Sequence, residues 1–134
     1  MNLLTVGIVG CGRICNGAHV PALKNIDGIK VKYACDLIAE KAETVKEKLG
    51  AEIACTDYRT VLADKQVDCV FVLTPNYAHY EVTMAALKAG KHVFCEKPIT
   101  VNYALSQEMY REAEKQGKIL NIGVCNRYHK SVEL

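Results

Sequence analysis

The sequence predicts a doubly wound α/β fold, with a mostly parallel sheet of about six strands and helices on both faces. Three observations support this. Short apolar runs alternate with helical periodicity along the whole chain. The first apolar run, residues 3–9, meets the turn Gly10-Cys11-Gly12, and a helical pattern follows at once. The run at 67–73 is apolar almost throughout, which is typical of a central parallel strand.

The first half of the chain should contain three strands and three helices. Pro21 lies well inside the first helix and should kink or divide it, because proline has no N–H to donate. Ile38, Ala42, Val45 and Leu49 recur at helical spacing and predict one apolar face of the second helix. The elements expected are strands at 3–9, 31–35 and 52–54 and helices at about 13–24, 38–49 (ended by Gly50) and 58–63.

In the second half, two asparagines are placed as helix caps. Asn76 follows the strand at 67–73, and Asn102 precedes the last helix. The elements expected are strands at 67–73, 92–95 and 119–124 and helices from Asn76 to about Ala89 and from Asn102 to Gly117. The inward positions expected are Val82, Ala85, Ala86, Ala89, Leu105, Met109 and Ala113.

Composition narrows the function classes. The 134 residues fit one domain with a formal net charge of +2, and the basic residues are scattered among acidic ones, which argues against a nucleic-acid partner. No apolar run is long enough to span a membrane, and the N-terminus lacks a signal-peptide pattern. The seven cysteines form no CxxC pair, so we expect neither a disulfide framework nor a metal site. A cytoplasmic protein with no membrane partner is expected.

In doubly wound sheets, ligands bind outside the carboxyl ends of the strands. Five groups of residues should therefore gather on one edge: 10–12, Asp36, 74–76, 96–97 and 125–127.

The glycine turn predicts a phosphate site. Gly10 would permit the tight turn, and Gly12 would let a pyrophosphate approach the backbone with no Cβ in the way. The helix that follows would offer its free N–H groups. The third glycine position of the motif holds Cys15, so the motif is imperfect. Cys11 and Cys15 are either low-pKa thiols or structural residues, and the structural interpretation is favoured.

Asp36 closes the second strand and could accept hydrogen bonds from both hydroxyls of an adenosine ribose. Its charge would repel a 2′-phosphate, and no Lys or Arg follows before Lys41, so NAD is favoured over NADP. The alternative is an aspartate that only caps the next helix.

The ends of the fourth and fifth strands should lie near the nicotinamide half of a dinucleotide. Thr74-Pro75-Asn76 is either part of that site or a plain turn with a cap. Lys97 could orient a substrate hydroxyl and lower its pKa, with the Glu96 carboxylate holding the amine, although a Glu-Lys pair is more often a surface ion pair.

These strings together resemble a known family. The chain reads Gly-Ile-Val-Gly-Cys-Gly-Arg-Ile at 7–14, His-Val-Pro-Ala-Leu at 19–23, Cys-Asp at 35–36, Thr-Pro-Asn-Tyr-Ala-His at 74–79, Glu-Lys-Pro at 96–98 and Gly-Val-Cys-Asn-Arg-Tyr at 123–128. In this order and over the whole length, they resemble the Gfo/Idh/MocA family of glucose–fructose oxidoreductase-like and inositol dehydrogenase-like enzymes. The Thr-Pro-Asn-x-x-His and Glu-Lys-Pro strings are more specific than the glycine turn.

The resemblance implies NAD(P)-dependent hydride transfer to or from a sugar, polyol or related hydroxy compound. It makes Lys97 the catalytic residue and implies a homo-oligomer. The cofactor-binding residues it implies, together with the turn and strand ends above, are Gly10, Cys11, Gly12, Arg13, Ile14, Asp36, Thr74, Pro75, Asn76, His79, Glu96 and Lys97.

Family enzymes continue into a second α/β domain that carries substrate contacts. We therefore expect residues 1–124 to form the dinucleotide-binding domain and 125–134 to begin a linker or second domain that this chain lacks. Such a chain should bind NAD without turning over substrate. The alternative function is a non-catalytic dinucleotide-binding sensor or regulatory module. The presence of Lys97 with Glu96 argues against it, because a sensor needs no substrate-facing amine.

Overall fold

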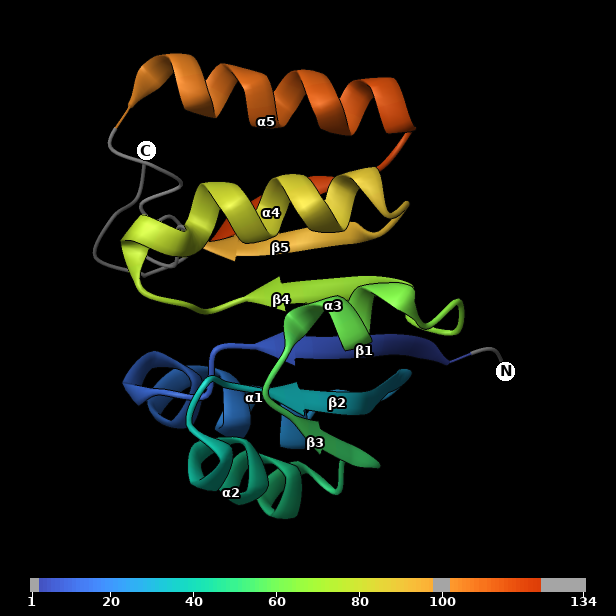
Figure 1. Cartoon of the computed structure of the whole chain (residues 1–134). Helices are drawn as coiled ribbons and strands as arrows, with labels where there is room; N and C mark the ends of the chain where they lie inside the picture. Colours follow the sequence, from blue (N-terminus) through green and yellow to red (C-terminus); the bar gives the residue numbers. More distant parts are fainter. Residues whose placement is uncertain (1–2, 98–101, 124–134) are drawn as a thin grey trace, which may run out of the picture.

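The computed structural model describes residues 3–97 and 102–123. It contains one sheet of six strands, all neighbours parallel, in the order β3-β2-β1-β4-β5-β6 (Figure 1). The direction of the strand order reverses between β1 and β4, where ligands bind in doubly wound sheets. The strands are β1 (Leu4–Val9), β2 (Ile29–Cys35), β3 (Ile53–Cys55), β4 (Cys69–Val72), β5 (His92–Glu96) and β6 (Leu120–Gly123).

Helices cover both faces of the sheet, as predicted. In Figure 1, α3 and α4 lie in front of the sheet and α1 lies behind it. The helices are α1 (Val20–Lys24), α2 (Ala39–Leu49), α3 (Tyr58–Ala63), α4 (His79–Lys88) and α5 (Tyr103–Gln116). A π-helical segment (Cys15–His19) precedes α1, and a 3₁₀ turn (Asn76–Ala78) precedes α4.

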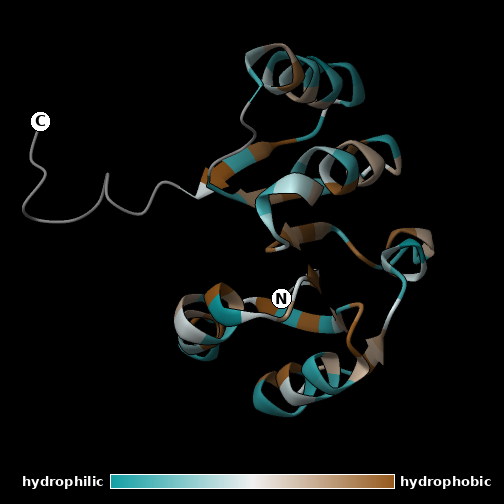
Figure 2. Ribbon diagram, turned by 60° about the vertical axis from the view of Figure 1, so that its left-hand side comes forward, coloured by the Kyte–Doolittle hydropathy of each residue, from teal (hydrophilic) through white to brown (hydrophobic). Residues whose placement is uncertain are grey.

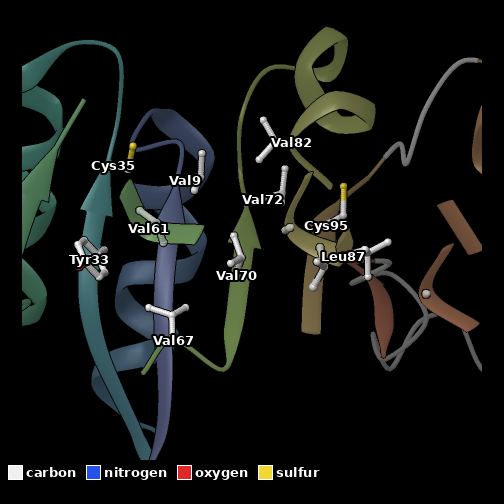
Figure 3. Packing of buried hydrophobic residues seen from close by; sticks show 13 residues of the cluster. Val9, Tyr33, Cys35, Val61, Val67, Val70, Val72, Val82, Leu87 and Cys95 are labelled. Atoms are coloured by element: carbon white, nitrogen blue, oxygen red, sulfur yellow. The ribbon is translucent and has the colours of Figure 1, made fainter. Parts of the chain in front are cut away.

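The core divides into two clusters because strand side chains alternate between the faces. Val70 and Val72 of β4 belong to the cluster beneath α3, α4 and α5 (Figure 3), whereas Cys69 belongs to the cluster beneath α1 and α2. Both valines are fully buried. Figure 2 shows hydrophobic residues in the strands and hydrophilic ones on the outer helix surfaces. The predicted central position of the fourth strand is thus confirmed.

The predicted break at Pro21 is also confirmed. The first helical segment is π-helical from Cys15 to His19, and the N–H of Val20 donates to the carbonyl of Cys15, five residues earlier. The helix α1 starts at Val20, directly after the π-helical segment, with Pro21 in its first turn, where a missing N–H costs little.

The predicted cap at Asn102 and the predicted helix ends at Gly50 and Gly117 are present in the structure. The Asn102 side chain accepts from the N–H groups of Ala104 (2.9 Å) and Leu105 (3.3 Å), as predicted. Gly50 and Gly117 end α2 and α5 in the left-handed conformation.

Three local predictions were wrong. Asn76 does not cap α4, because it is the first residue of the 3₁₀ turn that precedes α4, and the N-cap of α4 is Ala78, which makes no side-chain hydrogen bond. Ala89 is exposed and Leu87 is buried in its place, since α4 ends at Lys88. Ile38 is 51% exposed instead of facing the core, because α2 begins one residue later and Ile38 has an extended backbone.

Within residues 3–97 and 102–123, all cysteines are free and no group of three or more His, Cys, Asp or Glu side chains is arranged to hold a metal ion. No helix in the same residues combines the length and apolarity that crossing a membrane requires.

Candidate functional site

A cleft of about 950 Å³ lies at the carboxyl edge of the sheet, where the strand arrowheads of Figure 1 point. The predicted gathering of strand ends is confirmed for four of the five groups, and residues 125–127 lie outside the described residues. The predicted site residues that line the cleft are Gly10, Gly12, Ile14, Asp36, Thr74, Pro75, Asn76, His79, Glu96 and Lys97.

Gly10 and Gly12 differ in what an added side chain would meet. Gly10 has φ of +103°, and a Cβ there would lie 2.5 Å from the carbonyl carbon of Leu73 and 2.6 Å from the nitrogen of Thr74. Only glycine fits, because both its backbone conformation and the adjacent chain exclude a side chain. At Gly12 a Cβ would meet no protein atom within 4 Å. The space above Gly12 is open cleft.

Asp36 ties this turn to the end of β2. Its Oδ2 accepts from the N–H of Cys11 (2.8 Å), and its Oδ1 accepts from the N–H of Ile38 (2.9 Å). Asp36 is not the N-cap of α2, which is Ile38. A carboxylate has about four acceptor positions, so each oxygen keeps one for a ligand hydroxyl.

Cys11 and Arg13 do not line the cleft. Cys11 is fully buried beneath the turn, with Sγ 3.4 Å from the carbonyl oxygen of Cys35, and Arg13 is exposed. A hydrogen bond with the thiol of Cys15, together with burial, raises the pKa of Cys11 above its ordinary value. Cys15 is also fully buried, and the same hydrogen bond lowers its pKa. Because neither thiol is accessible to solvent, both positions fit the structural interpretation, with the side chains filling the core under the turn.

The turn after β4 is fixed by His79. The Nε2 atom of this fully buried side chain donates to the carbonyl of Thr74 at 2.8 Å. Thr74 Oγ1 is buried and has no hydrogen-bond partner in the described part of the chain. Because an unpaired buried hydroxyl is unfavourable, a ligand group in the cleft is a natural partner for Thr74.

The structure corrects the expected role of Glu96. Its Oε2 accepts from the backbone N–H of Lys97 (3.0 Å), and its Oε1 lies 2.7 Å from Nε2 of His19. Within the described residues, no ion pair joins Glu96 to the Lys97 amine. Glu96 therefore holds the main chain of Lys97, while the Lys97 side chain is exposed at the cleft.

Several residues of the cleft wall were not predicted from the sequence. Leu37 (88% exposed), Ile38 and Tyr77 (85% exposed) present apolar surface, and Lys41 lines the cleft near Asp36. The signal was an apolar pair, Leu37-Ile38, directly after a strand end where a loop is ordinarily polar. His19 belongs to the string at 19–23 quoted above, but no role was assigned to it, because that role depends on its contact with Glu96, 77 residues away in the sequence.

These residues fit a dinucleotide. The open space above Gly12 and the unpaired Thr74 hydroxyl lie in the same cleft, with Asp36 and exposed apolar residues along its wall. A dinucleotide carries a diphosphate, ribose hydroxyls, a flat apolar base and a carboxamide, and the cleft offers a partner to each.

Comparison with known proteins agrees with this geometry. Residues 4–124 match the model of an oxidoreductase family described by its NAD-binding Rossmann fold, GFO_IDH_MocA. Inositol 2-dehydrogenase of Salmonella typhimurium is 38% identical over 130 residues, which are 95% of this chain and 38% of that protein. Several other curated relatives are also dehydrogenases, among them the D-glucoside 3-dehydrogenase of Escherichia coli at 33% identity.

Solved structures show the same fold. A 3-ketoreductase from Actinomadura kijaniata, in complex with NADP and TDP-benzene, has a TM-score of 0.90 at 30% identity, over 96% of this chain and 39% of that one. Myo-inositol 2-dehydrogenase from Lactobacillus plantarum has a TM-score of 0.88 at 32% identity, over 97% and 39%. The chain thus spans less than half the length of these relatives.

Proposed function

The chain belongs to the Gfo/Idh/MocA oxidoreductase family, and we propose that it is the cofactor-binding domain of an NAD-dependent enzyme that oxidises or reduces a CH–OH group. The substrate class proposed is a sugar, polyol or related hydroxy compound, as the names of the relatives suggest. The observation that carries the proposal is the single cleft that joins the glycine turn and Asp36 to Lys97.

Each part of the cleft has a proposed role. Gly10, Gly12 and Ile14 hold the diphosphate, because backbone at the start of a helical segment attracts anions and Gly12 leaves space for one. Asp36 accepts from the adenosine ribose through its remaining lone pairs, and the exposed Leu37 and Ile38 offer apolar surface to the base.

The nicotinamide half is proposed to lie against Thr74, Pro75, Asn76, Glu96 and Lys97. When bound, the nicotinamide supplies C4 as the hydride acceptor or donor. Lys97 would hold the substrate hydroxyl and stabilise negative charge that develops on its oxygen. His79 supports the site from below, because its ring is buried and holds the Thr74 carbonyl.

The preference proposed is NAD over NADP, because the carboxylate of Asp36 would repel a 2′-phosphate. Lys41 lines the same cleft and has no ion-pair partner among residues 3–97 and 102–123, so it reduces this discrimination without reversing it. Lys41 lies in the first turn of α2, five residues after Asp36.

The remaining proposals concern the whole protein. We propose that residues 1–124 are the dinucleotide-binding domain and that 125–134 begin a linker toward substrate-binding structure, since the relatives are longer. Homo-oligomeric assembly is proposed on the family membership. A cytoplasmic location without nucleic-acid or membrane partners is proposed on the cysteine pattern, the scattered charges and the short apolar runs of the sequence.

The test is dehydrogenase activity of the protein at its natural length, with NAD and a panel of myo-inositol and free or glycosidic hexoses. Lys97→Met should abolish turnover while NADH still binds, whereas Lys115→Met, at an exposed site on α5, should change neither. NADH binding with no activity on any CH–OH substrate would favour the non-catalytic sensor instead.

A further inference from the structure

We propose that His19 is a positioning residue: its ring fixes the Glu96 carboxylate, which in turn fixes the main chain of Lys97. The inference rests on the proposed function, because it takes Lys97 as the substrate-facing residue. It assigns a role to a histidine on the helical segment that follows the glycine turn, 78 residues before Lys97 in the sequence.

The contact itself is short and sheltered. Nε2 of His19 lies 2.7 Å from Oε1 of Glu96, and the two side chains are 13% and 14% exposed. Water therefore competes poorly for either partner, and a hydrogen bond to a charged group in such a place contributes more than one at the surface. A carboxylate oxygen can only accept, so the Nε2 atom must carry the proton.

Aromatic side chains fix the direction of the ring. The His19 ring packs edge-on against Phe94 at 5.4 Å between centroids and against Phe71 at 6.1 Å. Phe71 and Phe94 are paired across β4 and β5, so both belong to the sheet and not to a loop. Since edge-to-face contacts restrict ring orientation, Nε2 stays aimed at Glu96.

The backbone supplies a second, independent indication. The π-helical segment ends at His19, and π segments are rare and often occur at functional sites. One extra residue in a turn changes the direction of the following side chains by roughly 100° relative to a regular α-helix. The irregular helix therefore sets where the His19 ring points.

The space that the Glu96 carboxylate and the Phe94 ring occupy is bounded by Gly123 of β6. Gly123 pairs with Glu96, and a Cβ at Gly123 would lie 3.3 Å from Glu96 Oε1 and 2.8 Å from Cζ of Phe94. A side chain there would push the carboxylate and the phenyl ring out of place, even though the backbone conformation of Gly123 is an ordinary one. Gly123 thus leaves room for both the Phe94 ring and the Glu96 carboxylate.

The second oxygen of Glu96 completes the chain of contacts. It accepts from the N–H of Lys97 at 3.0 Å, so both oxygens are occupied and the carboxylate cannot rotate freely. The helical segment that follows the glycine turn is thereby connected, through Glu96, to Lys97, the residue proposed to contact substrate. Loss of the His19 bond would release Glu96 and, with it, the main chain of Lys97.

The experiment measures the Lys97 amide directly by NMR hydrogen exchange on the 134-residue chain. His19→Leu keeps an apolar side chain against Phe71 and Phe94 but removes the donor, whereas His19→Gln keeps a donor of similar reach. The Lys97 amide should exchange roughly tenfold faster or more in the leucine variant, and at close to the wild-type rate in the glutamine variant. The Cys95 amide inside β5 is the internal reference.

Two outcomes would overturn the proposal. One is an unchanged Lys97 exchange rate in a folded His19→Leu protein, and the other is an equal acceleration in both variants, which would assign the effect to ring packing. If the leucine variant does not fold, ¹⁵N NMR of the His19 ring in the wild type tests the proposal instead. The proposal requires a proton on Nε2, and an unprotonated Nε2 would overturn it. NADH binding is measured separately in each variant, so failure of the cofactor site and failure of this inference are distinguishable.

Discussion

Replacing Gly12 with alanine separates binding from stability more cleanly than any other change in the cleft. The added methyl group would meet no protein atom within 4 Å, and the backbone of Gly12 has no positive φ. Folding should therefore be unaffected, or stabilised by about 0.4–1 kcal/mol, because alanine reduces the conformational freedom of the unfolded chain.

Binding should respond in the opposite direction. The methyl group would fill the open space where the diphosphate is proposed to approach the backbone. We expect the affinity for NADH to fall by at least about tenfold, or roughly 1.4 kcal/mol. The combination of retained stability and lost affinity is the signature of space kept for a ligand.

Gly10→Ala is the contrasting variant. Alanine at φ of +103° costs about 1–2 kcal/mol, and the Cβ would also lie 2.5 Å from backbone atoms that cannot move aside. Such overpacking typically costs a further 1–3 kcal/mol. The free energy of unfolding should fall by about 2–5 kcal/mol, a large share of a typical domain's stability.

The assay pairs urea unfolding with titration of NADH by nucleotide fluorescence. Gly17→Ala is the control, since a Cβ there also meets nothing within 4 Å but lies outside the cleft lining. It should leave affinity unchanged. Wild-type affinity in Gly12→Ala, or wild-type stability in Gly10→Ala, would refute the reasoning.

Two further predictions concern the fold. A hydrogen bond from Lys32, together with those from Gln66 N–H and Tyr33, lowers the pKa of Asp64 from 3.8 to about 2. The stabilisation from the lowered pKa is complete above about pH 4 and is lost as pH falls toward 2. In urea unfolding, the difference in free energy of unfolding between wild type and Asp64→Asn should therefore shrink over that range. A difference that stays constant with pH would contradict this prediction. Asn102→Ala should destabilise the chain by about 1 kcal/mol, whereas Asn102→Asp should not, and equal melting temperatures in all three would exclude the cap.

Most of the fold followed from local signals. The apolar runs at β1 and β4 and the glycine turn between strand and helix are each encoded within about ten residues, so they could be predicted without knowing any long-range contact. Clustering of strand ends then followed from the geometry of parallel sheets.

What could not be predicted depended on side-chain contacts, one of them within a turn and the others between distant segments. Ile38 fits a helical apolar period, yet it lies outside α2 with an extended backbone, and its N–H donates to the Asp36 side chain two residues earlier. The π-helical segment before Pro21 ends at His19, whose ring contacts the Glu96 carboxylate at the end of β5. Glu96 was expected to hold the Lys97 amine, but His19 occupies one of its oxygens and the Lys97 backbone the other.

The central claim, that this cleft binds NAD through the turn and Asp36, is tested most directly by titrating the wild-type chain and Asp36→Ala with NADH and NADPH. Because Asp36 also holds the Cys11 N–H, urea unfolding must accompany each titration, and Asp36→Asn retains one acceptor oxygen as the matched control. We predict tighter binding of NADH than NADPH by the wild type, with the preference lost in Asp36→Ala. Binding of neither nucleotide by the folded chain, or a preference for NADPH, would contradict the claim.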